Sequence, residues 1–503
     1  MVLDPRTPVL VGVGQVTERP GEDRDTNGRH EPLELMVRAV RAALADAGGT
    51  SSRLLSAVGS IRAVRSAQWP VPDPGALVAA ELGITPRESL CSSNGGTTPQ
   101  AFMAHSATQI ANGHLDAVIV AGAECGYTRA KAHRSGEWVT WTSQDPETPP
   151  ARPFGIDRNP STELEAARGV RAPVHAYPLI ENAIRMEAGW TLSEHRSHIG
   201  SLWSRFSGAA AANPYAWLRT PVGATEAIEP GPTNRMVAFP YPKLCTANFQ
   251  VDQGAAYICC AAETARAAGV PSERWIFPVS SAEANDHWFL SERVELSHSP
   301  AIRLAGQAAL GLAGVGIDDI AVADLYSCFP CVVQIAAREL GLDIDGDVSR
   351  LTLTGGLTFG GGPGNNYSSH GIASVVDALR RDPGRVGMST GLGWFATKHA
   401  IGLYSSEPPE GGFRSENVQA SVDALPKRAA DPDATGPAEV ETFTVTYGRD
   451  GSPEHGIVAC RTGPSSRAWA NVTDPGQLEA LMGAEQPGWS GTLGPGGTFD
   501  LSG

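Results

Sequence analysis

The 503-residue sequence has little of several features that mark whole classes of protein. No apolar run approaches the roughly 18 residues that cross a bilayer, and the start MVLDPRTPVLVGVGQ lacks a basic stretch followed by a long apolar one. Eight cysteines are too sparse for a disulfide framework, which fits a reducing compartment. Basic residues number 39 against 54 acidic ones, and the net charge of -15 disfavours nucleic acid or an anionic membrane surface as a partner. We therefore expect a soluble, cytoplasmic protein.

One glycine-rich segment, Leu353 to Gly371 (LTGGLTFGGGPGNNYSSHG), lacks a titratable side chain before Tyr367. It follows a β-like run and precedes a helix-like run, Ile372 to Leu379, so the pattern predicts a strand, a tight turn and a helix. Glycines let another backbone or a ligand approach closely, and amides at a helix start favour an anion or a developing oxyanion. The segment has the shape of a catalytic loop without a catalytic side chain.

Strand and helix patterns alternate in the first part of the chain. Pro8 to Val16 is predicted to be a strand, Glu31 to Ala47 an amphipathic helix, and Leu115 to Ala121 a buried strand. This alternation favours an α/β fold with a parallel sheet and crossover helices. The length suggests roughly two to four domains.

A weak internal repeat divides this α/β region. AALADAG at residues 42–48 returns as AALGLAG at 308–314, and each copy is followed by a β-like run. A glycine-rich turn before a helix also occurs twice, and the closing strands Ala117 to Gly122 and His399 to Tyr404 correspond. We predict two similar halves, residues 1–250 and 251–405.

Three regions lie outside this repeat. Residues 125–239 are rich in Trp, Arg and Pro, contain one predicted helix at 178–207, and are expected to form a lid or substrate-binding insertion. Residues 406–437, rich in Pro, Gly and charge, are predicted to be a linker. Alternating runs on both sides of a turn at 449–451 predict a small all-β domain over 438–503.

Taken together, these features resemble the thiolase superfamily, in particular the branch related to the sterol-carrier-protein thiolases. The resemblance rests on the two halves, on VDQGAAYICCAAETARAAG at 251–269 and on the loop that ends in Gly-Pro-Gly, and it covers about residues 5–405. It implies a duplicated five-layer αβαβα fold, with two five-stranded sheets that sandwich helices, and an acyl-CoA substrate class. TFTVTYGRDGSPEHGIVACRT and RAWANVTDPGQL resemble the OB-fold domains that accompany thiolase-like proteins and aldolases. Such a domain is associated with acyl-CoA binding, or it is a plain dimerisation or stabilising barrel.

The resemblance also locates the nucleophile position. A thiolase uses a cysteine at the start of a buried helix, where the helix N-terminus and a nearby histidine lower the thiol pKa. The matching helix here follows CSSNGGTTPQA, and the family pattern places the nucleophile at Gly95, or at Gly96 in a second register. Neither residue has a side chain that can attack a thioester. Cys91 lies beyond the first turn, within which the helix dipole acts, and is either a displaced nucleophile or an ordinary buried thiol.

The other thiolase signatures are altered as well. The activating histidine of the GHPxG motif maps onto Gly362, which follows Gly361. The second cysteine maps onto Ser389 or Thr390, ahead of Gly391. Tyr326 stands where the resemblance implies an oxyanion-hole Asn or His. It can donate a hydrogen bond or, with a lowered pKa, act as an acid or base; the alternative is that it only fills space.

Three further signals point less clearly to chemistry. Cys328 and Cys331 have the CxxC spacing of redox motifs, without a thioredoxin-like setting. His195 and His198 share a helical face, but no further ligand motif accompanies them, so we predict no metal site. His399 either faces the pocket or is a satisfied core histidine.

We therefore expect a thiolase-like, acyl-CoA-binding protein related to acetyl-CoA acetyltransferases but without ordinary thiolase activity. The glycines would leave a roomy pocket lined by backbone amides. CoA or acyl-CoA is the expected ligand, with no other cofactor, and the chain is expected to be a monomer or a homodimer. One alternative is a retro-aldolase for a β-hydroxyacyl-CoA in lipid or steroid breakdown, with Tyr326 and Tyr367 handling protons. A second alternative is a binding or assembly subunit without chemistry, so the sequence leaves open whether a reaction is catalysed.

Overall fold

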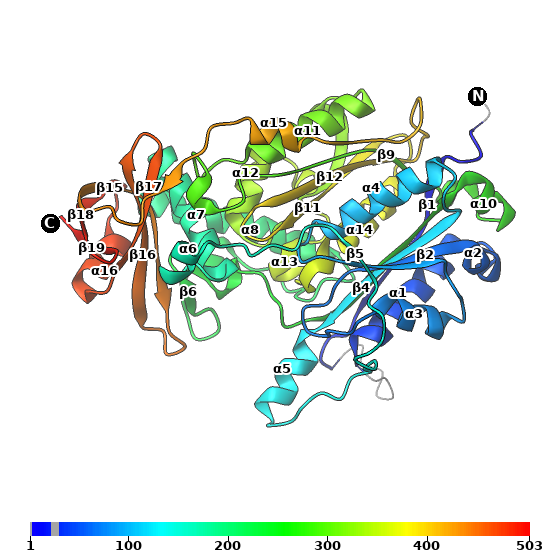
Figure 1. Cartoon of the computed structure of the whole chain (residues 1–503), viewed down its shortest axis with the longest axis horizontal. Coiled ribbons are helices and arrows are strands. Elements are labelled where there is room, and N and C mark those ends of the chain that lie inside the picture. The colour runs from blue at the N-terminus through cyan, green and yellow to red at the C-terminus, as the bar shows by residue number, and fades with distance from the viewer. Residues whose placement is uncertain (1–2, 22–29, 503) are drawn as a thin grey trace.

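A computed structural model describes residues 3–21 and 30–502 of the chain. Figure 1 shows an α/β half with the N-terminus at one end, a second α/β half beside it, and a β-barrel with the C-terminus at the other end. Within the described ranges, none of the helices combines the length and hydrophobicity that a transmembrane span requires.

The first half is built on a six-stranded sheet with the order β1-β8-β4-β2-β3-β5. β8 runs antiparallel to β1 and β4, whereas β4, β2, β3 and β5 are parallel to one another. Both β4 and β8 are buried along their whole length, as expected of an inner layer. The strands are β1 Pro8–Thr17, β2 Val58–Ala63, β3 Glu88–Ser92, β4 Ala117–Cys125, β5 Arg152–Phe154 and β8 Asp252–Ala261.

The second half repeats this topology in a sheet with the order β10-β11-β12-β9-β13. β11 is parallel to β10 and antiparallel to β12, as β4 is parallel to β2 and antiparallel to β8. The counterpart of β4 is therefore β11, and the predicted match of Ala117 to Gly122 with His399 to Tyr404 is wrong. β4, β11 and β12 are all buried and mostly apolar, so composition alone could not tell them apart. The strands are β9 Phe277–Asn285, β10 Ile320–Asp324, β11 Val386–Gly393, β12 Lys398–Ser405 and β13 Arg414–Asn417.

Helices fill the remaining layers. α4 (Thr98–Ala111) and α14 (Tyr367–Arg381) lie between the two sheets and share one hydrophobic cluster with β4, β8 and β12. α1 (Pro32–Ala47) and α3 (Pro74–Leu82) cover the outer face of the first sheet, and α11 (Pro300–Ala313) and α12 (Pro330–Leu340) cover the outer face of the second. The predicted five-layer αβαβα arrangement is confirmed. The remaining short helices of the two halves are α2 Ser51–Ala57, α10 Ala262–Ala267 and α13 Gly356–Phe359.

The insertion between the halves contains several helices rather than one. The helix predicted at 178–207 is two helices, because Gly189 adopts a left-handed conformation after α7 and Thr191 caps α8. β5 also belongs to the insertion and covers the open edge of β3. The other elements are α5 Gly126–Arg134, α6 Glu163–Ala167, α7 Pro173–Ala188, α8 Leu192–Ala212, α9 Ala224–Ile228, β6 Met236–Ala238 and β7 Tyr241–Pro242.

The segment predicted to be a linker, residues 406–437, runs from the second half to the barrel but is not unstructured. β13 pairs in parallel with β9, and α15 (Gln419–Asp423) follows it directly. β14 (Ala429–Ala430) then pairs with a barrel strand. The Pro, Gly and charged residues of the segment serve the turns between these short elements.

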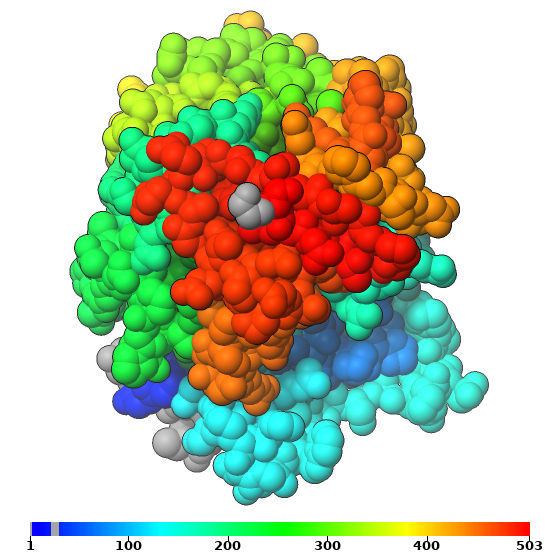
Figure 2. All heavy atoms as spheres, turned by 90° about the vertical axis from the view of Figure 1, so that its left-hand side faces the viewer, coloured from blue at the N-terminus to red at the C-terminus, as the bar shows by residue number. Residues whose placement is uncertain are grey.

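The C-terminal domain is a closed five-stranded barrel. β15 pairs with β16 and β18, β17 pairs with β16 and β19, and β18 pairs with β19, which closes the ring and is consistent with an OB-like domain. Its last two strands lie in the glycine-rich end, which the sequence pattern had not marked as strand. Figure 2 shows the barrel spheres lying directly against segments of the insertion. The elements are β15 Gly436–Tyr447, β16 Pro453–Gly463, β17 Ser466–Val472, α16 Pro475–Gly483, β18 Ser490–Gly494 and β19 Thr498–Leu501.

The glycine-rich segment 353–371 differs from its prediction. No strand precedes it; a 3-10 turn (Val348–Arg350) leads into it instead. The short α13 lies within it, and α14 begins at Tyr367, five residues before the helix predicted from Ile372. The sequence pattern missed this first helical turn because Tyr367 to His370 are polar. Their side chains are nevertheless buried and hydrogen-bonded rather than solvated.

Candidate functional site

The start of α4 is the place that the thiolase resemblance marks for the nucleophile. β3 ends at Ser92, and a short loop containing Gly95 and Gly96 leads into α4. A Cβ atom added to Gly96 would lie 2.3 Å from Cε2 and 2.5 Å from the hydroxyl oxygen of Tyr326. The Tyr326 ring, which follows β10 of the second half, therefore fills the space of a side chain at position 96.

Neighbouring residues close this space further. The backbone N–H of Tyr326 donates to Oγ1 of Thr390 at 2.8 Å. A Cβ atom on Gly391 would lie 2.7 Å from Cα of Thr97 and 2.9 Å from the carbonyl oxygen of Gly96. The structure thus brings Gly95, Gly96, Tyr326, Thr390 and Gly391 together, and the expectation of a roomy pocket is wrong at Gly96 and Gly391. Glycine is needed here because two backbones and one ring pack in direct contact.

The two candidate tyrosines lie edge to face, with ring centroids 5.2 Å apart. The Tyr367 hydroxyl donates to Oδ1 of Asp324 at 2.9 Å and also contacts Oγ1 of Thr354 at 2.6 Å. Asp324 accepts the backbone N–H of Thr354 as well, so Tyr367 fixes the glycine-rich segment to the end of β10. Burial raises the pKa of both Tyr326 and Tyr367 well above 10. Both are therefore neutral hydrogen-bonding groups rather than bases.

The glycine-rich segment contacts the first half through its asparagines. Oδ1 of Asn365 accepts the backbone N–H of Gly95 at 2.8 Å, and Nδ2 of Asn366 donates to the carbonyl oxygen of Gly122 at 2.7 Å. A Cβ atom on Gly361 would lie 2.1 Å from the Gln253 side chain, and one on Gly362 would lie 3.1 Å from the carbonyl oxygen of Asn248. Gly361 and Gly362 therefore pack against β8 and the segment that leads into it, while Asn365 reaches the loop before α4 and Asn366 reaches β4.

Lys398 is a site residue that sequence reasoning did not assign a role. It begins β12, is buried, and its ammonium group donates to Oγ of Ser93 at 3.1 Å and to the carbonyl oxygens of Asn94 at 2.9 Å and Ile156 at 3.1 Å. A Cβ atom on Gly95 would lie 3.3 Å from the same nitrogen. Among the described residues no carboxylate accepts a hydrogen bond from it, and burial lowers its pKa to about 8. The only signal in the sequence was a lysine inside an apolar run.

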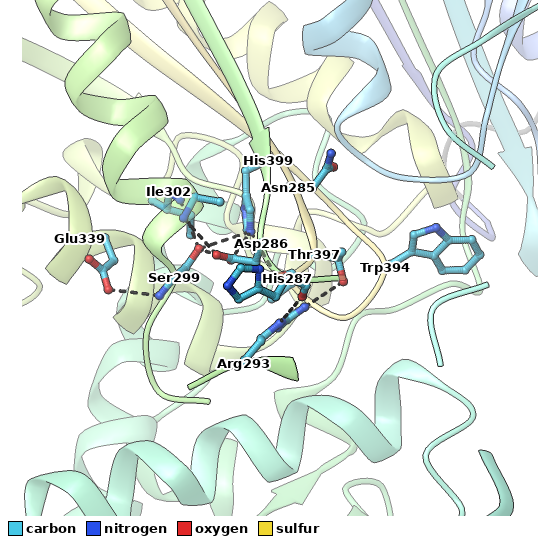
Figure 3. A network of polar contacts seen from close by, with 12 residues as sticks. Asn285, Asp286, His287, Arg293, Ser299, Ile302, Glu339, Trp394, Thr397 and His399 are labelled. Carbon is cyan, nitrogen blue, oxygen red and sulfur yellow. Dashed lines mark hydrogen bonds and ion pairs between the residues drawn. The ribbon is translucent and has the colours of Figure 1, made fainter. Parts of the chain in front are cut away.

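His399, the next residue, is a satisfied core histidine. Figure 3 shows it among side chains from β9 and α11, and its Nε2 lies 3.1 Å from Oδ2 of Asp286 and 3.1 Å from the carbonyl oxygen of Ala396. Asp286 also accepts the backbone N–H of Ala301 at 3.0 Å. Burial alone would raise the pKa of Asp286, but His399, Arg293 and Ser299 together outweigh it and lower that pKa. The pair joins β9, β12 and α11.

The candidate cysteines are not activated. Cys91 lies on β3, half-buried, at the wall of a cavity away from Tyr326, and burial raises its pKa. Cys328 and Cys331 are buried free thiols, and burial raises the pKa of each. None of the three is poised to attack a thioester, because the thiolate is the nucleophile.

The two histidines of the insertion have different settings. Nε2 of His195 lies 2.8 Å from Oε1 of Glu181, and both side chains are fully buried between α7 and α8. His198 packs on the ring of Trp190. No group of three or more metal-ligating side chains was found in the described ranges.

Known protein families and a solved structure match this chain. Residues 282–375 match the thiolase C-terminal domain-like family, and residues 417–498 match the additional C-terminal domain of thiolase-like protein type 1. The crystal structure of a monomeric SCP2-thiolase like protein type 1 from Mycobacterium smegmatis is 33% identical, covers 100% of both chains and superposes with a TM-score of 0.83. The chain belongs to the SCP2-thiolase-like proteins of type 1.

An enzyme and a second solved structure are more distantly similar to this chain. An acetyl-CoA acetyltransferase of Methanocaldococcus jannaschii is 26% identical over 281 residues. The match covers 55% of this type 1 protein and 62% of that enzyme, which is less than two thirds of the enzyme's length. The structure of the Ltp2-ChsH2(DUF35) aldolase is 21% identical, covers 80% of this chain and 99% of the other, and has a TM-score of 0.59. At that identity the aldolase shares the fold alone.

Proposed function

We propose that this protein binds an acyl-CoA thioester near the start of α4 without forming an acyl-enzyme. The observation that supports this most directly is the contact between Gly96 and Tyr326, because a ring from the other half occupies the volume of a nucleophilic side chain. Covalent acyl transfer needs a nucleophile beside an activating base. Around Tyr326 the chain presents phenol, hydroxyl and backbone groups instead.

Groups suited to holding a thioester line a small cavity next to this position. The cavity has a volume of about 240 Å³ and is bordered by Thr97, Lys398 and Asn285. The Lys398 ammonium can give up one of its three bonds to neutral oxygens and donate to a ligand carbonyl. We assign these groups a binding role: Lys398 on β12 supplies the charge, and Thr97 at the start of α4 supplies a hydroxyl group.

A retro-aldol reaction receives less support from the tyrosines. Such a reaction needs a base for the β-hydroxyl proton, and burial raises the pKa of Tyr326 and Tyr367. The Tyr367 hydroxyl is further committed to Asp324.

Calorimetric titration with octanoyl-CoA, acetyl-CoA and CoA tests the binding proposal. We expect saturable binding of acyl-CoA, weaker binding in the Lys398→Met variant, and unchanged binding in Lys131→Met, whose side chain is exposed on α5. In parallel, acetoacetyl-CoA and CoA are incubated with the protein while the enolate absorbance is followed. No thiolysis is expected, and intact mass spectrometry should show no acyl adduct. Rapid turnover or a covalent adduct would contradict the proposal, as would the absence of any acyl-CoA binding.

A further inference from the structure

A second, larger cavity lies in the first half, about 580 Å³ in volume, which is the size of a typical small-molecule site. It is bounded by β3 and β5 on one side and by residues 69–74 on the other. Its apolar lining includes Trp69, Phe154 and five prolines, and its polar lining includes Ser66 and Ser92. The residues around Tyr326, namely Gly95, Gly96, Thr390 and Gly391, and Tyr326 itself do not line it.

Its walls are held in place by hydrogen bonds that do not depend on a ligand. β5 pairs with β3, and the backbone N–H of Ser93 donates to the carbonyl oxygen of Phe154 at 2.7 Å. The N–H of Ala151 donates to the carbonyl oxygen of Pro72 at 3.0 Å, and the indole N–H of Trp69 donates to Thr142 at 2.7 Å. Prolines fix the backbone further. The cavity is therefore preformed rather than a gap that side chains could close.

The larger cavity and the small cavity beside Lys398 are neighbours. Ser93, Phe154 and Gly155 border both this cavity and the small one beside Lys398. These residues therefore form a common wall between an apolar chamber and the small cavity that contains the Lys398 ammonium group. Arg65 and Asp157 also line the apolar chamber and form an exposed ion pair with each other at 3.4 Å, so these two charges are paired.

We propose that the apolar chamber holds the acyl chain of the ligand, with its carbonyl end directed toward Lys398. This proposal rests on the proposed function and adds to it the location and class of the acyl group: an aliphatic chain long enough to leave the polar site. Each buried methylene group should tighten binding about fourfold, which favours long acyl groups over acetyl.

Cys91 provides a reporter inside the chamber. It borders the cavity and is half-buried, whereas the other seven cysteines are fully buried, so a thiol reagent should label Cys91 selectively in the native protein. The labelling rate is measured alone, with CoA, and with octanoyl-CoA, and Cys91→Ser serves as the labelling blank. With octanoyl-CoA at ten times its dissociation constant we expect labelling to slow about tenfold, because only about a tenth of the chains remain free. CoA should leave the rate nearly unchanged.

The outcomes separate the two proposals. If octanoyl-CoA binds by calorimetry but does not protect Cys91, the chamber is not the acyl site, while the proposed function stands. If CoA protects as well as octanoyl-CoA, the chamber holds the CoA portion and the inference is overturned. If no acyl-CoA binds at all, the proposed function fails and the inference falls with it.

A substitution that places a large side chain in the chamber gives an independent test of this proposal. Ala151 borders the cavity, so Ala151→Phe should weaken octanoyl-CoA binding at least about tenfold and leave acetyl-CoA binding nearly unchanged. Ala420→Phe, at an exposed position on α15, is the matched control. Equal losses for both ligands in Ala151→Phe would contradict a chamber that is specific for the acyl chain.

Discussion

At several positions of this site only glycine fits, because neighbouring atoms occupy the space of a larger side chain. Gly96, Gly361 and Gly391 each place the Cβ position within 3 Å of atoms from another segment. The resemblance to thiolases assigned these positions to an acyl-CoA pocket, but it could not show that Tyr326 fills the volume at Gly96. That information comes from residues 230 positions apart in sequence, which only the fold brings together.

Gly96→Ala should therefore destabilise the protein. The added methyl group would overlap the Tyr326 ring, at a cost of about 1–3 kcal/mol, measurable by urea unfolding. The cost should shrink in the Gly96→Ala, Tyr326→Ala double variant relative to Tyr326→Ala, because the ring is then absent. Gly208→Ala is the control: this α8 position has open space around it, so the change should be neutral or stabilise the helix by up to about 1 kcal/mol. Equal effects at positions 96 and 208 would show that the ring does not pack there.

Glu124 gives a pH dependence with a defined sign. Its carboxylate accepts from Oγ of Ser66 at 2.8 Å and the N–H of Ala67 at 2.7 Å, but burial dominates and raises its pKa from 4.5 to about 7. The folded state therefore holds this proton more tightly than the unfolded state. Its contribution to stability is complete below pH 4.5 and is lost as the pH rises to about 7.

The measurement compares urea unfolding of the wild type and Glu124→Gln across this pH range. The wild type should lose up to about 3 kcal/mol relative to the variant between pH 4.5 and 7. The exposed Glu137→Gln should run parallel to the wild type. A constant difference between wild type and Glu124→Gln would mean that the carboxyl group has the same pKa in the folded and unfolded states.

At the scale of elements, sequence periodicity predicted best where one face of an element is buried and the other solvated. α1 lies within one residue of its prediction, with Pro32 at its start and a left-handed Gly48 at its end. Prediction failed where tertiary contacts replace solvent. The start of α14 is polar yet buried, and β18 and β19 form from a glycine-rich end because barrel closure supplies their partners. β5, three residues long, carries no periodic signal at all.

β5 nevertheless has a clear role that can be tested. Phe154 at its end stacks on Phe102 of α4 with ring centroids 4.6 Å apart, which anchors the strand over β3. Phe154→Ala should destabilise the protein by about 1–3 kcal/mol, less than for a fully buried ring, and should raise the labelling rate of Cys91 severalfold. Trp138→Ala, at a side chain that is 91% exposed, should change neither quantity. An unchanged Cys91 rate in Phe154→Ala would mean that β5 does not shield the cavity.

At the scale of the whole molecule, the barrel is continuous with the α/β body. Ile457, Ala459 and Trp469 of the barrel belong to the same hydrophobic cluster as α7, α8 and α12. The Trp469 indole N–H donates to Oγ of Ser291 at 2.9 Å, and Nδ2 of Asn182 on α7 donates to the carbonyl oxygen of Phe443 at 2.8 Å. The sequence predicted a separate domain from its change in composition. Its dependence on the insertion could not be predicted, because these contacts join residues far apart in sequence.

The barrel and α7 should therefore open as one cooperative unit. Hydrogen exchange of peptides from β16, β17 and α7 should show similar protection in the wild type, since each buries its apolar face against the others. Trp469→Ala removes a side chain that is 2% exposed and should cost about 3–5 kcal/mol. Its effect should appear in α7 peptides as strongly as in barrel peptides, whereas exchange in β4, which belongs to a different cluster, should change less. If the barrel peptides lose protection while α7 keeps it, the barrel folds independently of the insertion.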